Sequence, residues 1–250
     1  MMRKSITVAK TDFKNALDLR FVKLGLVMSV AFGPVMIILM FVSLMAIVPP
    51  AEFGIVLMLL GPIVPSILGI FSIIPTTMIA ANALVGEREM NTLEPLLCTP
   101  LTDRELLWGK TMAGAIPSLI ILVSSTIASV VGVAVLSVAM GFPMLIILDI
   151  AGVFLLSTAV PIMIFAIIAV MIIVSGRVTR VYEAYQMTTA VIIVFIIPMI
   201  LPMIGFEAGN IAELVWLCNF ITLIIAALLF VIGWAVALKL FNRDKLVSMV

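Results

Sequence analysis

Long apolar stretches separated by short polar breaks make up most of this 250-residue chain. Six of them are long enough to cross a bilayer, which takes about 20 apolar residues. They cover residues 24–48, 54–85, 111–140, 144–174, 187–204 and 214–240. Lipid offers the backbone no hydrogen-bond partners, and a closed barrel would need alternating segments of about ten residues. The pattern therefore predicts an all-α polytopic membrane protein with six transmembrane helices, of which span two is long and broken by Pro62, Pro65 and Pro75.

The residues before the first span carry a pattern of their own. Apolar side chains recur there at three- and four-residue steps, with polar residues on the other faces: Ile6, Ala9, Phe13, Leu17 and Phe21. This period predicts an amphipathic helix within residues 1–23 that lies in the membrane interface. The helix is either an anchor for the first span or also a contact for a cytosolic partner.

Composition and charge extend this prediction. The chain is 64% hydrophobic and 11% charged, whereas soluble domains are near half apolar and a quarter charged. All 14 Lys and Arg fall on one predicted side, in residues 1–23, 86–110, 175–186 and 239–250. The positive-inside rule then places both termini in the cytoplasm, and we expect a plasma-membrane location. The sequence has no histidine and only two cysteines, which excludes imidazole catalysis, histidine-bound metals and a disulfide framework.

The charged break at residues 86–110 contains two helix signals. Three leucines form one apolar helical face: Leu93, Leu96 and Leu97. Pro100 ends that first helix, because proline lacks an amide donor and disfavours helix before it. Thr102 and Glu105 have the spacing of a capping box, which predicts a second helix that continues into the third span. The segment is either a solvated connector or a stiff coupling element.

At this segment the sequence resembles the permease subunits of ABC-2 type transporters, which are ATP-driven exporters. Their loop between helices two and three reads GER-E-x-x-T-L-E-x-L-L-x-T-P-L-x-x-x-E-L-x-x-G-K, and residues 86–110 match it, with Asn91 where the family often has glycine. The basic tail at residues 241–250 is similar as well. The resemblance implies an ABC-2 exporter fold with an elbow helix (1–23), a six-span domain (24–240) and a cytoplasmic tail.

The resemblance also implies the partners. Two copies, or two related permeases, would form the translocation path, and each would dock a separate ATPase subunit that holds ATP and Mg²⁺. This chain would bind no cofactor or metal and catalyse no reaction, and its Gly109-Lys110 pair lacks the earlier glycine that a phosphate-binding loop needs. We expect lipid contacts and no nucleic-acid partner. The implied ATPase-coupling residues are Glu87, Arg88, Glu89, Leu93, Glu94, Leu96, Leu97, Thr102, Arg104 and Glu105.

Polar residues within the spans are candidates for the translocation path. Close helix packing also explains a stripe of small residues on span two. The candidate path residues are Ser72, Thr76, Thr77, Asn82, Asp149, Gln186, Thr188, Thr189 and Asn219. Asp149 is the one acid well within a predicted span, either a functional group or a carboxylate kept ionised near the outer end. Pro198 and Pro202 predict a break in span five, and the resemblance implies a re-entrant hairpin over residues 197–216.

Two other function classes are alternatives to the exporter, and the sequence bears on each of them. An intramembrane enzyme would need histidine or a carboxylate pair, and the spans contain neither. A secondary transporter or ion channel not driven by ATP is the alternative to the exporter, although such carriers usually place ionisable groups near the midplane. A path without fixed cations disfavours a strongly anionic cargo, and lipidic, drug-like or small cationic solutes fit it.

Overall fold

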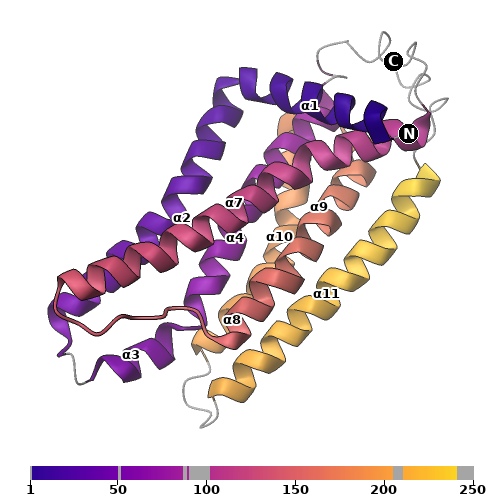
Figure 1. Ribbon diagram of the computed structural model, residues 1–250. Helices are drawn as coiled ribbons and strands as arrows, with labels where there is room; N and C mark the ends of the chain where they lie inside the picture. The colour runs from indigo at the N-terminus through magenta and orange to yellow at the C-terminus, as the bar shows by residue number, and fades with distance from the viewer. Residues whose placement is uncertain (1, 50–51, 87–88, 90–101, 205–210, 241–250) are drawn as a thin grey trace.

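The computed structural model describes residues 2–49, 52–86, 89, 102–204 and 211–240 (Figure 1). This part of the chain is helical almost throughout and contains no strand. Six of its helical segments are long and apolar enough to cross a membrane. This confirms the predicted helical class and the prediction of six helices long and apolar enough to cross a membrane.

The spans follow the chain in order. Span one is α2 (Arg20–Ile47), and span two is α4 (Ile63–Ala81) continued by a π-helix, η1 (Asn82–Gly86). Span three is α7 (Asp103–Ala139). Span four joins α8 (Ile150–Phe154), the π-helix η2 (Leu155–Ala159) and α9 (Val160–Ser175). Spans five and six are α10 (Val181–Ile204) and α11 (Ile211–Leu240), while α1 (Met2–Asp18) and α3 (Phe53–Leu60) are additional helices.

Spans two and four form the centre of the bundle. Their most hydrophobic windows are 61% and 56% buried, against 28% or less for the other four spans. Leu68, Ile73 and Ile164 are fully buried in this core. The outer helices instead expose apolar side chains such as Ile127 and Leu228. Outward-facing apolar side chains are what helices in contact with lipid require.

The segment predicted as span two, residues 54–85, is interrupted at Pro62 as predicted, whereas α4 continues through Pro65 and Pro75, where a break was also predicted. The segment divides at Gly61 and Pro62 into α3 and α4, and α3 lies at the end of the bundle opposite α1 (Figure 1). Proline fixes its own backbone and suits the start of a helix rather than its interior. The 24 residues from Ile63 to Gly86 are sufficient to span a bilayer without α3.

Span four begins six residues later than predicted, because residues 142–149 are not helical. Gly141 ends the preceding turn with a positive φ of 80°, and Pro143 follows it. The amide of Leu145 then donates a hydrogen bond to the Ser137 hydroxyl of α7 (3.3 Å). These contacts hold the segment in an irregular conformation although its composition is as apolar as that of a span.

Asp149 consequently lies outside the span. Its carboxylate accepts a hydrogen bond from the Gly152 amide (2.7 Å) and caps the N-terminus of α8, and the residue is exposed. The prediction of an acid well within a span was therefore wrong, because the helix starts at Ile150. A carboxylate at this position satisfies an otherwise unpaired helix amide.

The two prolines near the end of span five do not interrupt it. α10 continues through Pro198 and Pro202 to Ile204, and α11 starts at Ile211. The described parts of residues 197–216 thus extend two long helices, and the predicted break at the prolines is wrong. Transmembrane helices tolerate proline because neighbouring groups and local adjustments satisfy the freed carbonyls. Residues 205–210 of the predicted hairpin lie outside the described residues.

Candidate functional site

The structure gathers several polar contacts at one end of the bundle, which we call the basic end. It carries α1 and the last residues of α9 and α11, with Arg177 just after α9 and Lys239 near the end of α11 (Figure 1). The amphipathic helix predicted from the sequence is α1, which ends at Asp18 and packs against α7. Its most buried positions are Ala9, Asp12 and Ala16, whereas Ile6 is 61% exposed.

Gly109 allows α1 to approach α7 closely. A Cβ atom at this position would lie 2.8 Å from the Val8 side chain and 3.0 Å from the Ser5 carbonyl oxygen. Both distances are shorter than van der Waals contact, and the second involves backbone that cannot rotate away. The glycine before Lys110 therefore serves helix packing.

An ion pair lies directly beside this contact. The Lys110 ammonium of α7 is 4.0 Å from the Asp12 carboxylate of α1, and the two side chains are only 5% and 7% exposed. Lys110 also donates a hydrogen bond to the carbonyl of Ala83 in η1. Buried charges require such partners, because each loses its hydration. One lysine thus joins α1, the start of α7 and the end of span two.

The first turn of α7 is capped as the sequence predicted. The amide of Glu105 donates to the Thr102 hydroxyl (3.3 Å), and the amide of Thr102 donates to the Glu105 carboxylate (3.1 Å). This confirms the capping box. Leu106 and Leu107 are buried directly after it. The cap and this packing hold the helix start in place, where four amides would otherwise lack partners.

Glu89 connects the predicted coupling segment to span five. Its carboxylate accepts a hydrogen bond from the amide of Val181, the first residue of α10 (2.9 Å). A negative charge at a helix N-terminus is favourable for the helix dipole. The remaining coupling candidates fall outside the described residues or have undescribed side chains: Glu87, Arg88, Leu93, Glu94, Leu96, Leu97 and Arg104.

A second polar contact joins spans two and five. Asn82, at the start of η1, donates to the Tyr185 hydroxyl of α10 (2.9 Å) and to the Met78 carbonyl (2.7 Å). The Tyr185 hydroxyl in turn donates to the same carbonyl (3.2 Å). A π-helix places an extra residue in the turn and often occurs at functional sites. Here the π-helix contains both Asn82 and Ala83, whose carbonyl accepts the hydrogen bond from Lys110.

The other predicted path residues fall into two groups. Ser72, Thr76 and Thr188 are fully buried within this chain, and Thr77 is 8% exposed. The Ser72, Thr77 and Thr188 hydroxyls donate to carbonyls of their own helices, while the Thr76 hydroxyl has no hydrogen-bond partner among the described residues. In contrast, Gln186 and Thr189 are exposed on α10. Of these residues, only Gln186 and Thr189 lie on the outer surface of the chain.

Two candidates lie at the opposite end of the bundle. Asn219 of α11 is buried and donates to the Ala151 carbonyl of α8 (2.9 Å). Asp149 borders a cavity of about 210 Å³ that Trp216 also lines. Within the described residues, no group of three or more His, Cys, Asp and Glu is placed to hold a metal ion.

The sequence matches no protein-family model and no curated protein. The arrangement of the site must therefore be interpreted from its own chemistry. Its side-chain contacts connect α1, the end of span two, the start of α7 and the start of α10. Among the described residues it contains no set of groups arranged for acid–base or nucleophilic catalysis.

Sequence analysis did not identify two of the central residues, Asp12 and Tyr185. Asp12 did carry a signal, since it stands at helical spacing between Ala9 and Ala16, on a stripe of small residues. A lone carboxylate on such a stripe predicts a buried partner. Tyr185 carried none, because its partner Asn82 is 103 residues away.

Proposed function

We propose that this chain is the permease subunit of an ABC-2 type exporter. In this proposal it forms a homodimer in the plasma membrane, with both termini in the cytoplasm. A separate ATPase subunit binds ATP and Mg²⁺ and docks on residues 86–110. The chain itself binds no cofactor and catalyses no reaction.

One observation carries the proposal: both ends of the 86–110 segment are built into the helix bundle. Gly86 ends η1, and Thr102 caps α7. Glu89 contacts the N-terminus of α10, and Lys110 binds α1. A simple connector needs no such fixation, since Gly141 allows this chain to turn within a few residues. A segment that must pass a displacement from a partner to several spans does need it.

The length of α7 supports the same interpretation. It is a single helix of 37 residues, or about 55 Å at 1.5 Å per residue. It leads from the capped end of the segment to the far end of the bundle (Figure 1). Displacement of its first turn therefore changes the orientation of a whole transmembrane helix.

The polar face of α10 supports the second copy. Tyr182, Gln186 and Thr189 are exposed on this helix, although lipid cannot satisfy polar groups. The side-chain nitrogen of Gln186 donates a hydrogen bond to the Tyr182 hydroxyl (3.1 Å). The side-chain oxygen of Gln186 can then accept a hydrogen bond from another donor. A second protomer or the aqueous path between two protomers provides the donors that this face requires.

The first test is copurification. A tagged chain is purified in mild detergent from cells that express the candidate P-loop ATPase, and the bound proteins are identified. We expect one ATPase per permease, lost when Glu94→Lys and Arg104→Glu are combined. Arg177→Glu, an exposed charge change at the same end but outside the segment, is the matched control and should retain the ATPase. An oligomer of this chain without any nucleotide-binding partner would instead support a secondary transporter or channel.

The second test concerns coupling. Leu97→Asp places a charge on the predicted docking face, and Leu106→Pro removes the amide that donates to the Thr102 carbonyl (3.0 Å). Both variants should insert into the membrane and lose ATP-driven export. Normal export by both variants would contradict the coupling role of residues 86–110.

A further inference from the structure

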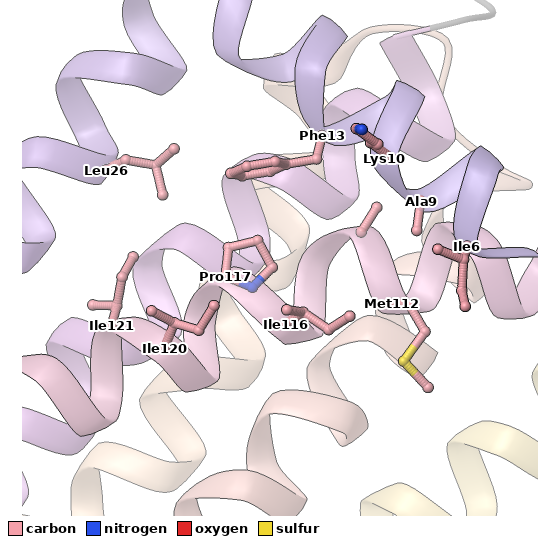
Figure 2. A pocket seen from close by; sticks show the side chains of 11 residues that line it. Ile6, Ala9, Lys10, Phe13, Leu26, Met112, Ile116, Pro117, Ile120 and Ile121 are labelled. Atoms are coloured by element: carbon pink, nitrogen blue, oxygen red, sulfur yellow. The ribbon is translucent and has the colours of Figure 1, made fainter.

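An open groove runs between the amphipathic helix and the membrane-spanning helices at the basic end. Its volume is about 410 Å³. Figure 2 shows its two walls, with α1 side chains on one side and α7 side chains on the other. The residues that line it are Ile6, Ala9, Lys10 and Phe13 of α1, Leu26 of α2, and Met112, Ala113, Ile116, Pro117, Ile120 and Ile121 of α7.

The lining selects an apolar occupant. Ten of its eleven side chains are hydrocarbon or thioether, and Lys10 is the exception. Water needs two to four polar partners to occupy a cavity, so a groove with this lining does not favour it. A polar peptide would leave its backbone donors and acceptors unsatisfied here. A hydrocarbon chain has no such groups.

The groove faces the place where hydrocarbon chains are found. Ile116 and Ile120 are 49% and 62% exposed, and the same face of α7 continues with exposed Val123 and Ile127. These residues recur every three or four positions, so they form one outward stripe of a transmembrane helix. The groove is the end of this stripe, roofed by α1.

The charge at the rim specifies the headgroup. Lys10 lies on α1 at the edge of the groove (Figure 2). Lys14, Arg20 and Lys23 are exposed nearby in sequence, with Asp18 the one exposed acid among the described side chains of residues 5–23. Asp12 does not oppose them, because its carboxylate faces Lys110 in the interior. Basic segments beside a membrane attract anionic lipids.

We propose that this groove binds one acyl chain of an anionic phospholipid, whose net negative headgroup pairs with Lys10. The lipid comes from the leaflet at the basic end. The site is lateral to the bundle and on the opposite side of α1 from the solvent. It requires only a membrane-spanning chain and does not depend on the proposed transport function.

Native mass spectrometry of the delipidated full-length protein tests this proposal. Phosphatidylglycerol and phosphatidylcholine with identical acyl chains are added separately at equal concentrations. We expect one tightly bound phosphatidylglycerol per chain and weaker binding of phosphatidylcholine. Lys10→Gln should lower the affinity for phosphatidylglycerol about fivefold and leave that for phosphatidylcholine unchanged. Lys239→Gln removes an exposed cation at the end of α11 and should have no effect.

A second pair of variants tests the groove itself. Ile116→Trp fills it from a half-exposed position, so we expect both lipids to be lost from the tight site. Ile127→Trp makes the same change three turns further along α7, outside the groove, and should bind lipid as the original chain does. Equal binding of the two lipids, or full retention by Ile116→Trp, would overturn the proposal. A dimer that disappears in Ile116→Trp with the lipid count unchanged would assign the groove to a second copy and overturn it as well.

Discussion

The carboxylate of Asp12 lies 4.0 Å from the ammonium group of Lys110, and more than nine-tenths of each side chain is buried. The two residues are on α1 and α7, and Lys110 also reaches the π-helix at the end of span two. This pair is the point at which the amphipathic helix becomes part of the transmembrane bundle. α1 is therefore held by a specific contact as well as by helix packing against α7.

Removing one member of this pair should destabilise the protein. Lys110→Met removes the ammonium that lies beside the buried Asp12 carboxylate, at a cost of about 3 kcal/mol. For a chain of this size the melting temperature should fall by roughly 10 °C. The combined variant Asp12→Leu, Lys110→Met removes both charges and should recover most of the loss. A double variant no more stable than Lys110→Met would contradict a direct interaction, and Lys239→Met is the exposed-lysine control.

Replacement of Gly109 should separate α1 from α7. In Gly109→Ala the added methyl group lies within 3.0 Å of the Ser5 carbonyl, so we expect a loss of about 1–3 kcal/mol from overpacking. Gly114→Ala is the matched control on the same helix, because its Cβ would be 3.6 Å or more from its neighbours. Thermal unfolding of the two variants in one detergent measures the difference. Equal melting temperatures would show that α1 moves aside without cost.

The cap of α7 should control fraying of its first turn. Thr102→Ala removes the hydroxyl acceptor and should cost about 1 kcal/mol of local stability. Hydrogen–deuterium exchange of residues 103–107 should then be about fivefold faster, since exchange follows the free energy of local opening. Thr102→Ser keeps the hydroxyl and should exchange at the original rate. Identical exchange in Thr102→Ala would mean that tertiary packing alone fixes this turn.

Orientation can be measured with cysteine labelling. In a background with Cys98→Ser and Cys218→Ala, single cysteines are placed at two exposed positions on opposite ends, Glu52→Cys and Arg177→Cys. The positive-inside rule predicts that a membrane-impermeant maleimide labels position 52 in intact cells and position 177 only after permeabilisation. The reverse pattern would contradict cytoplasmic termini.

The elements that could be predicted from the sequence are those with local causes. Hydrophobic length alone gives the six spans, and the spacing of Thr102 and Glu105 gives the cap. The start of span four could not be found in this way, because the residues before Asp149 are apolar although they are not helical. Their conformation depends on Gly141 and on the Ser137 hydroxyl, a contact eight residues away.

In the candidate site, too, features with local causes could be predicted from the sequence and contacts between distant residues could not. Residues 86–110 were proposed as a coupling segment from their sequence, whereas the hydrogen bonds that attach them to the bundle join partners 27 and 92 residues apart. Such contacts depend on which helices pack together and in what register, and a single sequence does not reveal either. Small residues gave a partial indication, since Gly109 and the alanines of α1 lie where the two helices meet most closely.

Pro117 links lipid binding in the proposed groove to the bending of α7. Proline has no amide hydrogen, so the carbonyl of Ala113 lacks its helical donor and α7 bends most easily at this position. Both residues line the groove beneath α1, and bending changes its width. A lipid that binds the straight form more tightly shifts α7 toward that form, and bending weakens lipid binding by the same factor. Under the proposed lipid binding, the content of anionic lipid in one leaflet therefore contributes to the free energy needed to bend this helix.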